Sequence, residues 1–267
     1  MRGFTNSSNI KKLSIALLIL MPGMLFAQQD TIPDVDTVKV NPAVMVTRGV
    51  NPPKLRSFIV PAVFISYGLV AFGDNAIRTL DVSTRNELQE DHPTFANHAD
   101  DYLRFVPAVA FYGLNLAGVK SKHSVADGTG LYVLSASIMG LSTFYIKRIA
   151  DRDRPDGSNN YSFPSGHSAS AFAAAEFLNQ EYRDVSPWIG YAGYTVATAT
   201  AVLRVYNNRH WVSDVVAGAG FGIASTKLAY LIYPRMKRVF IRKQPVRYSI
   251  VPMYQQRAAG LAFSGTF

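Results

Sequence analysis

The sequence predicts an all-α protein, built as a bundle of six helices that associates with a membrane. Charged residues make up only 17% of the chain and apolar residues 48%, which is a low share of charge for a soluble protein. Uncharged runs recur at lengths that suit helices, and several approach the roughly 20 residues that a membrane span requires. The mean hydropathy of +0.07 is low for six spans, so we expect some helices to be buried in protein or to lie at the membrane surface.

The helices are expected between residues 57 and 234, which together form one helical domain. They are placed by six uncharged runs: Ser57–Gly73, Phe105–Val119, Gly128–Ile146, Ser168–Ala175, Ser186–Leu203 and Val215–Tyr233, the last broken only by Lys227. In the final run, Gly218 and Gly222 lie four residues apart. Both therefore face one side of a helix, where they allow a close approach of its neighbour.

A polar segment separates the first two runs and is expected to be amphipathic in part. Near its end, Asp100 and Asp101 resemble a catalytic carboxylate pair. Acidic residues in a first helical turn also complement the helix dipole. We interpret the two aspartates as the start of the helix that follows, and we interpret His92, His98 and His123 as ordinary loop residues.

The N-terminus has the layout of a secretory signal. Lys11 and Lys12 precede a short apolar run that ends at Ala27. Residues 1–27 are therefore expected to be a cleaved signal peptide or an uncleaved anchor. Residues 28–56 contain four prolines and no helical period, and we interpret them as a linker.

The C-terminal tail, residues 235–267, is basic. Seven basic and no acidic residues lie between Arg235 and Arg257. Such a cluster beside an apolar segment favours a cytoplasmic anchor next to a bilayer. A nucleic-acid-binding arm is the weaker interpretation, because aromatic residues are not interleaved on a basic face. The end of the tail is expected to form a small hairpin.

Three polar islands interrupt the apolar half of the chain, each near the end or the start of a predicted helix. They comprise Lys147 and Arg154 in "KRIADRDRP", Ser165, Gly166 and His167 in "PSGH", and Arg204, His210 and Asp214 in "LRVYNNRHWVSD". In an up-and-down bundle the helix ends that carry these islands lie at one end of the molecule. The sequence therefore predicts that the islands share one site.

The basic residues of the islands suit a tetrahedral oxyanion. Lys147, Arg154 and Arg204 supply forked and point positive charge. Ser165 and Gly166 stand at the start of a helix, where backbone N–H groups and the helix dipole attract anions. Gly166 has no side chain to block a close approach. We expect these residues to bind a phosphoryl group.

The histidines of the islands supply the chemistry. Asp214 follows His210 by four residues, so its carboxylate can accept from one ring nitrogen and leave the other as a nucleophile. His167 comes from a different helix and is expected to protonate the leaving group. No acidic residue follows His167 before Glu176. Only His210 is therefore expected to have a carboxylate that orients it.

The three islands resemble the type 2 phosphatidic acid phosphatase superfamily, which also includes bacterial acid phosphatases and vanadium haloperoxidases. The family pattern is K-x6-RP, then PSGH, then SR-x5-H-x3-D, and all the internal spacings match over Lys147–Asp214. One departure is Leu203, which stands where the family usually has a small polar residue. It removes one hydroxyl donor to the phosphate.

The resemblance implies a helical bundle of the acid phosphatase and haloperoxidase type, and a phosphatase that uses no metal ion or other cofactor. His210 would become a phosphohistidine, oriented by Asp214. His167 would act as the general acid and then as the base for water. The phosphoryl oxygens would be held by the other polar residues of the islands: Lys147, Arg154, Ser165, Gly166 and Arg204.

The apolar helices favour a phosphorylated lipid as the substrate: phosphatidate, phosphatidylglycerophosphate, undecaprenyl pyrophosphate or a lipid A phosphate. A soluble periplasmic acid phosphatase acting on small phosphate esters is the alternative, favoured by the modest hydropathy. A vanadate-dependent haloperoxidase is disfavoured because those proteins are usually much larger. The complete set of His167, His210 and Asp214 argues against a non-catalytic membrane scaffold.

Both leading interpretations place the protein in a bacterial cell envelope. The positive-inside rule puts Lys54, Lys120 and the tail in the cytoplasm, which leaves the active site facing the periplasm. A working signal sequence followed by six spans would turn the site to the cytoplasm instead. We favour an inner-membrane protein with a periplasm-facing site, or a periplasmic protein. A membrane is the expected partner besides the substrate, nucleic acid is not, and no oligomeric state is predicted.

Overall fold

The computed structural model describes residues 53–240, 247–255 and 258–266. The expected signal or anchor at residues 1–27 and nearly all of the expected linker lie outside the described residues. The chain divides after Thr47 into two units, and the described residues all belong to the second.

The described residues form an all-α bundle and a β-hairpin, which confirms the predicted fold class. The helices are η1 (Leu55–Phe58), α1 (Ile59–Val70), α2 (Ala76–Asp91), α3 (Asp100–Leu103), α4 (Val106–Leu116), α5 (Val125–Ala150), α6 (Gly166–Tyr182), α7 (Pro187–Tyr206) and α8 (Val212–Phe240). The six uncharged runs correspond to α1 and to α4 through α8. The polar segment contributes α2 and α3, which the sequence predicted only as a partly amphipathic stretch.

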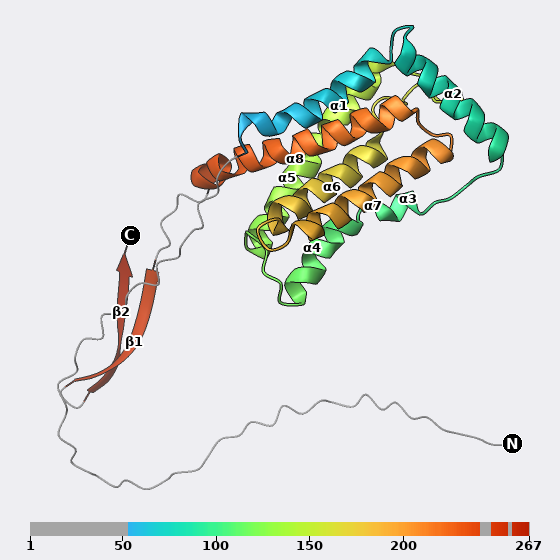
Figure 1. Ribbon diagram of the computed structural model, residues 1–267. Helices are drawn as coiled ribbons and strands as arrows, with labels where there is room; N and C mark the ends of the chain where they lie inside the picture. Colours follow the sequence, from blue (N-terminus) through green and yellow to red (C-terminus); the bar gives the residue numbers. More distant parts are fainter. Residues whose placement is uncertain (1–52, 241–246, 256–257, 267) are drawn as a thin grey trace, which may run out of the picture. The chain divides into compact units, whose positions relative to one another are not determined.

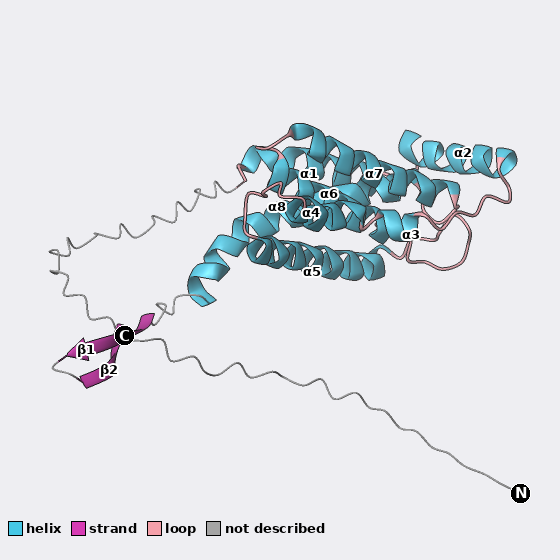
Figure 2. Cartoon of the chain, turned by 90° about the horizontal axis from the view of Figure 1, so that it is seen from below, coloured by secondary structure: helices cyan, strands magenta, loops and turns pink. Residues whose placement is uncertain are grey.

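The bundle is organised around α6 and α8. α6 packs against α7, α8, α4 and α5, and α8 also packs against α1 and α5 (Figure 1). α2 lies at one end of the bundle in both ribbon views (Figures 1 and 2). This end also contains the start of α8, because Asp81 of α2 accepts from the Ser213 backbone N–H at 2.9 Å.

Glycines on α8 allow it to approach α6 closely, as the sequence predicted. A Cβ atom added at Gly218 would lie 2.6 Å from the carbonyl oxygen of Ser165, and one added at Gly222 would overlap the carbonyl oxygen of Ala169. Neither position has room for a side chain. This contact fixes the distance between the start of α6 and the start of α8, where two of the polar islands lie.

Helix boundaries bring the polar islands together, as expected. Lys147 lies in the last turn of α5 and Arg204 in the last turn of α7. Ser165 is the N-cap of α6, and Asp214 lies in the first turn of α8. The Ser165 N–H donates to the Asp214 carbonyl oxygen at 3.0 Å, which joins the second island to the third.

The C-terminal hairpin expected from the sequence is present. β1 (Arg247–Gln255) and β2 (Ala258–Thr266) pair antiparallel, with Arg247 opposite Thr266. The preceding helix, α8, continues through Pro234 to Phe240, so the helical part ends later than the predicted boundary at residue 234. A proline removes one backbone hydrogen bond of a helix, and here the helix continues on its far side.

Two of the described helices are long and apolar enough to cross a membrane: Val125–Ala150, which is α5, and Val212–Lys237, which is most of α8. They differ in burial, since only 17% of the apolar window of α5 is buried but 61% of that of α8. α8 is therefore mainly a core helix, whereas α5 presents most of its apolar residues outward.

Candidate active site

The loop between α5 and α6 connects the first two islands. Lys147 donates from Nζ to the carbonyl oxygens of Tyr161 at 2.7 Å and Ser162 at 3.3 Å. The Ser162 N–H in turn donates to the Arg152 carbonyl oxygen at 3.0 Å. These bonds hold the end of α5 against the residues that lead into α6.

His210 lies just before α8 and is only 2% exposed. Its Nδ1 is 3.7 Å from Asp214 Oδ2 and 3.5 Å from the Ser162 hydroxyl, which donates to the same Oδ2 at 2.5 Å. The 3.7 Å separation is too long for a direct hydrogen bond. Asp214 therefore acts on the ring through its charge and through Ser162. Among the described residues none bonds to Nε2, so this nitrogen is available to a substrate.

Burial lowers the pKa of His210 from 6.5 to about 4, while Asp214 acts in the opposite direction. The positive charges of Lys147 and Arg204 add to the lowering. The imidazole is therefore neutral near pH 7. Neutral imidazole is the form that can act as a nucleophile.

His167 has a carboxylate partner, contrary to the expectation from sequence. Its Nε2 lies 2.7 Å from Asp101 Oδ1. Asp101 precedes His167 by 66 residues, so the residues near His167 in sequence give no sign of this contact. Burial and Arg204 lower the pKa of His167, and the bond to Asp101 opposes them. Both histidines of the islands are thus oriented by an acid.

Asp100 and Asp101 begin α3, as predicted, but they also contact the site. Asp100 is buried and accepts from Arg204 Nη1 at 2.7 Å and from Asn207 Nδ2 at 3.3 Å. With His167, the two carboxylates offer ligand atoms within 4.8 Å of one another, close enough to hold a metal ion. Arg204 already binds Asp100, and His167 already binds Asp101. Each carboxylate therefore has a side-chain partner in the structure as described.

The other histidines lie outside this arrangement. His98 is an exposed neighbour of it, with Nδ1 3.8 Å from Asp101 Oδ2. His123 is in a loop, as expected, but its Nδ1 lies 2.7 Å from the buried carboxylate of Glu181, near the C-terminal end of α6. That contact joins the loop before α5 to α6.

The basic residues of the islands have unused donors. The Nε atoms of Arg154 and Arg204 are buried and have no hydrogen-bond acceptor in the described part of the chain. A buried donor without an acceptor is costly. Phosphoryl oxygens accept strongly from guanidinium groups. The two arginines can therefore bind a phosphoryl group at little cost to their existing contacts.

The start of α6 is less open than the sequence indicated. The Ser165 side chain is buried and caps the helix by accepting from the Ser168 N–H at 3.4 Å, and its own N–H is bonded to Asp214. Ser165 thus positions the turn. At Gly166 an added Cβ would meet only Lys147 Cε, at 3.9 Å, so this backbone borders open space beside Lys147.

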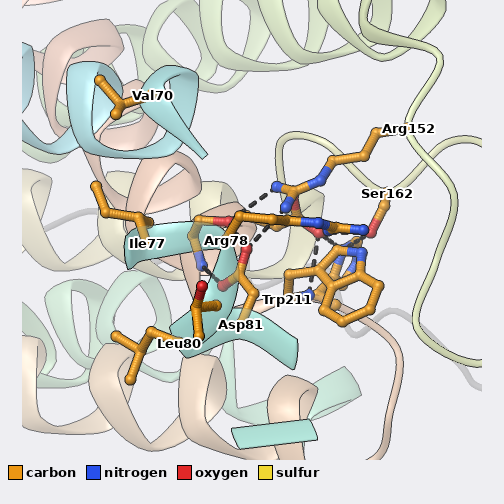
Figure 3. Close-up of polar contacts among 12 residues, drawn as sticks. Val70, Ile77, Arg78, Leu80, Asp81, Arg152, Ser162 and Trp211 are labelled. Atoms are coloured by element: carbon orange, nitrogen blue, oxygen red, sulfur yellow. Dashed lines mark hydrogen bonds and ion pairs between the residues drawn. The ribbon is translucent and has the colours of Figure 1, made fainter. Parts of the chain in front are cut away.

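Besides Asp100, which binds Arg204, sequence reasoning missed several polar residues that contact the islands or their partners. Asp101 binds His167, Ser162 binds Asp214, and Arg152 joins Asp214 to Asp81 (Figure 3). Arg152 and Ser162 lie close to the motifs in sequence, but the residue types there are not specified by the family pattern. Asp81 and Asp101 lie in the polar segment, and only the tertiary fold brings them to the site.

The helical bundle and the motif residues gathered at its end define a protein of the phosphatidic acid phosphatase type. The chain belongs to the PAP2 superfamily, whose sequence model matches residues 90–238. The match begins near the end of α2 and includes all three islands. Asp81 lies before it.

Curated relatives of the chain are lipid A 1-phosphatases. The protein of Porphyromonas gingivalis is 39% identical over 145 residues, which cover 52% of this chain and 32% of the relative. The protein of Rhizobium etli is 30% identical over 146 residues, which cover 48% of this chain and 60% of the relative. The chain thus matches a third to three fifths of the length of these relatives.

Two solved structures match part of the chain. One is a transmembrane PAP2-type phosphatidylglycerolphosphate phosphatase from Bacillus subtilis, with 18% identity, a TM-score of 0.45, and coverage of 69% of this chain and 99% of that one. The other is LpxE of Aquifex aeolicus, with 18% identity, a TM-score of 0.41, and coverage of 54% and 92%.

Proposed function

We propose that this protein is a phosphatase that removes a phosphoryl group from a lipid through a phosphohistidine on His210. The observation that carries the proposal is a buried neutral imidazole that feels the charge of Arg204, next to arginine Nε atoms that are buried and have no acceptor among the described residues. The first is a nucleophile, and the second is a cradle for phosphoryl oxygens.

The reaction has two steps. In the first, His210 Nε2 attacks phosphorus, the P–N bond forms and the bond to the leaving oxygen breaks, while that oxygen takes a proton from His167. In the second, His167 takes a proton from water, the water oxygen attacks phosphorus, and the P–N bond breaks to release inorganic phosphate. Asp214 stabilises the positive charge that His210 acquires.

Positive side chains take the part that a metal ion has in many phosphatases. Lys147, Arg154 and Arg204 neutralise the charge on the phosphoryl oxygens, and the backbone at Gly166 leaves them room. We therefore propose that activity needs no divalent metal.

A lipid substrate is supported by the apolar surface. Large apolar side chains on α5 are exposed, among them Val133 at 58%, Leu141 at 61% and Ile149 at 82%. Exposed apolar side chains on a helix long enough to span a membrane are characteristic of contact with lipid. The curated relatives act on lipid A, which makes a lipid A phosphate the first substrate to test.

An apolar pocket beside the islands can receive the tail of such a lipid. Its volume is about 540 Å³, and it lies between α1, α2, α6, α7 and α8. Val205 follows Arg204 directly, and Val212 and Val215 lie on either side of Asp214; all three line the pocket. An acyl chain in this pocket would lie next to the phosphoryl site.

A soluble periplasmic acid phosphatase is the second candidate. It is favoured by the finding that only two of the described helices are long and apolar enough to span a membrane. Extraction without detergent separates the candidates, since release of active protein into the aqueous phase supports the soluble enzyme. For either candidate we propose a bacterial envelope location with the site facing the periplasm, and residues 1–27 as its signal or anchor.

The proposal is tested with the purified full-length protein on a panel of lipid A, phosphatidylglycerophosphate, phosphatidate, undecaprenyl pyrophosphate and nitrophenyl phosphate. We expect release of inorganic phosphate from at least one lipid, preserved after chelator treatment and lost in His210→Ala. His92→Ala is the matched control, because the His92 side chain is exposed and its ring lies 6.0 Å from that of Tyr206. Failure with every substrate would contradict the proposal, and activity restored only by a divalent ion would contradict its metal-free form.

A further inference from the structure

Arg152 occupies an unspecified position of the K-x6-RP motif, yet it is buried and bridges two carboxylates (Figure 3). Its Nη1 donates to Asp214 Oδ1 at 2.6 Å and to the Ser213 hydroxyl at 2.8 Å. Its Nη2 donates to Asp81 Oδ2 at 2.7 Å. One guanidinium group therefore joins α2 to the first turn of α8.

Both partners of Arg152 are fixed from other directions. Asp81 Oδ1 accepts from the Ser213 N–H at 2.9 Å, and Asp81 Oδ2 accepts from the Ser213 hydroxyl at 2.5 Å. The guanidinium carbon lies 5.2 Å from the centre of the Phe72 ring and 5.8 Å from that of Trp211. These rings help to exclude water, which strengthens charge interactions at this point.

The two oxygens of Asp214 consequently have different roles. Oδ1 accepts from Arg152. Oδ2 accepts from the Ser162 hydroxyl and from the backbone N–H of Trp211 at 3.0 Å, and it is the oxygen nearest His210. Rotation of the carboxylate would break the ion pair with Arg152. The orientation that serves His210 is thus secured by a contact on the far side of Asp214.

We propose that Arg152 and Asp81 are positioning residues, which hold Asp214 with one oxygen toward His210 and balance its charge. The inference rests on the proposed role of His210 as the nucleophile. Neither residue touches the phosphoryl site, so they act only through Asp214. Asp81 lies before residues 90–238, the part of the chain that matches the family model, so it supplies this support from outside that part.

The charge balance gives the proposal a distinctive signature. The charged groups that act on His210 are Lys147 from α5, Arg204 from α7 and Asp214 from α8, with Arg152 behind Asp214. Removing the negative charge of Asp81 leaves the positive charge of Arg152 balanced by Asp214 alone. Asp214 then stabilises a proton on His210 less, so protonation of His210 becomes harder. Removing the positive charge of Arg152 leaves two carboxylates and makes protonation easier.

The test is the pH dependence of kcat/KM for Asp81→Asn and Arg152→Met. We expect the acidic limb to move to lower pH in the first variant and to higher pH in the second, each by about one unit, the low end for a neighbouring charge. In both, kcat should fall about tenfold, as for loss of an outer-shell partner at a metal site, while KM stays within about twofold. A purely structural role would not move the limb in opposite directions.

A double variant, Arg152→Met with Asp81→Asn, separates charge from orientation. It restores the balance of charge, so its limb should return toward that of the wild type, while kcat should stay low because Asp214 can rotate. Asp91→Asn, exposed on the same helix as Asp81, is the control and should match the wild type. Asp81→Asn keeps the shape of the side chain. If Arg152→Met does not fold, the shift of the acidic limb to lower pH in Asp81→Asn is the test by itself.

Unchanged limbs, or limbs that move in the same direction in both single variants, would overturn the inference. The failure of the proposed function is recognised separately, because the wild-type protein would then release no phosphate. In that case the ionisation of His210 is followed by NMR of histidine-labelled protein, for which the same opposite shifts are expected. Identical titrations of the wild type and both variants would overturn the inference there as well.

Discussion

The contact between His167 and Asp101 leads to the sharpest prediction about the acid step. Asp101→Asn keeps the size of the side chain and removes its charge. In the wild type, Asp101 raises the pKa of His167 against burial and Arg204, which lower it. Without the carboxylate the pKa of His167 falls further, so less of the imidazole carries the proton that the leaving group needs.

The size of the effect follows from the exposure of the pair. A buried opposite charge within hydrogen-bond distance changes a pKa by one to three units, but the Asp101 side chain is 45% exposed. Water screens such a pair, so we expect a fall of about one unit. Above the pKa, one unit reduces the protonated fraction tenfold. The rate on an alkyl or lipid phosphate should therefore fall about tenfold at pH 7.

The assay compares two leaving groups. Nitrophenolate needs little protonation, so Asp101→Asn should cost less than about threefold on nitrophenyl phosphate, well below the loss on a lipid phosphate. Glu90→Gln, exposed on α2, controls for removal of a charge from the polar segment. Equal losses on both substrates would contradict this role of Asp101, because they would assign it to a step other than proton donation.

The pH dependence, the phosphoryl site and the helix packing each have an expected outcome. His210 must be neutral to attack and its pKa is about 4, while His167 must be protonated and its pKa lies below 6.5. As the pH rises, kcat/KM should thus increase through about pH 4, where His210 loses its proton. It should then decrease from a point below pH 6.5, where His167 loses its proton. A rate still rising at pH 8 would contradict this assignment. Vanadate should inhibit competitively, with His210 as its axial ligand and Lys147, Arg154 and Arg204 around its equatorial oxygens; noncompetitive inhibition would count against a shared pocket. Gly222→Ala should lower the free energy of unfolding by about 1–3 kcal/mol through overpacking against Ala169, whereas Gly140→Ala, with nothing within 4 Å, should raise it by about 0.5–1 kcal/mol; similar melting curves for both would argue against the close contact of α6 and α8.

Features that depend on local spacing could be predicted from the sequence. The uncharged runs indicated six of the helices, and the four-residue spacing of His210 and Asp214 indicated that they face each other. Gly218 and Gly222 indicated the close packing of α8. The glycines lie on one helix, where the helical repeat fixes the geometry, and His210 lies just before the helix that carries Asp214.

Contacts across the bundle could not be predicted in this way. Asp81 and Arg152 are 71 residues apart, and Asp101 and His167 are 66 apart. Which acid meets which base depends on how α2 and α3 pack at the end of the bundle. In a polar segment, few apolar residues recur at helical spacing to mark the face that packs against the bundle. Single acidic residues on α2 and α3 were therefore indistinguishable from solvated ones until the fold was known.

Trapping the covalent intermediate shows directly whether His210 is the nucleophile. The full-length protein is mixed with a substrate that it hydrolyses, and the reaction is quenched at alkaline pH. The protein is then digested and analysed by mass spectrometry. We expect one phosphorylated histidine, His210, with more of it in His167→Ala on an activated ester because hydrolysis of the intermediate is slowed. A phosphoryl group on His167, or full turnover by His210→Ala, would contradict this role of His210.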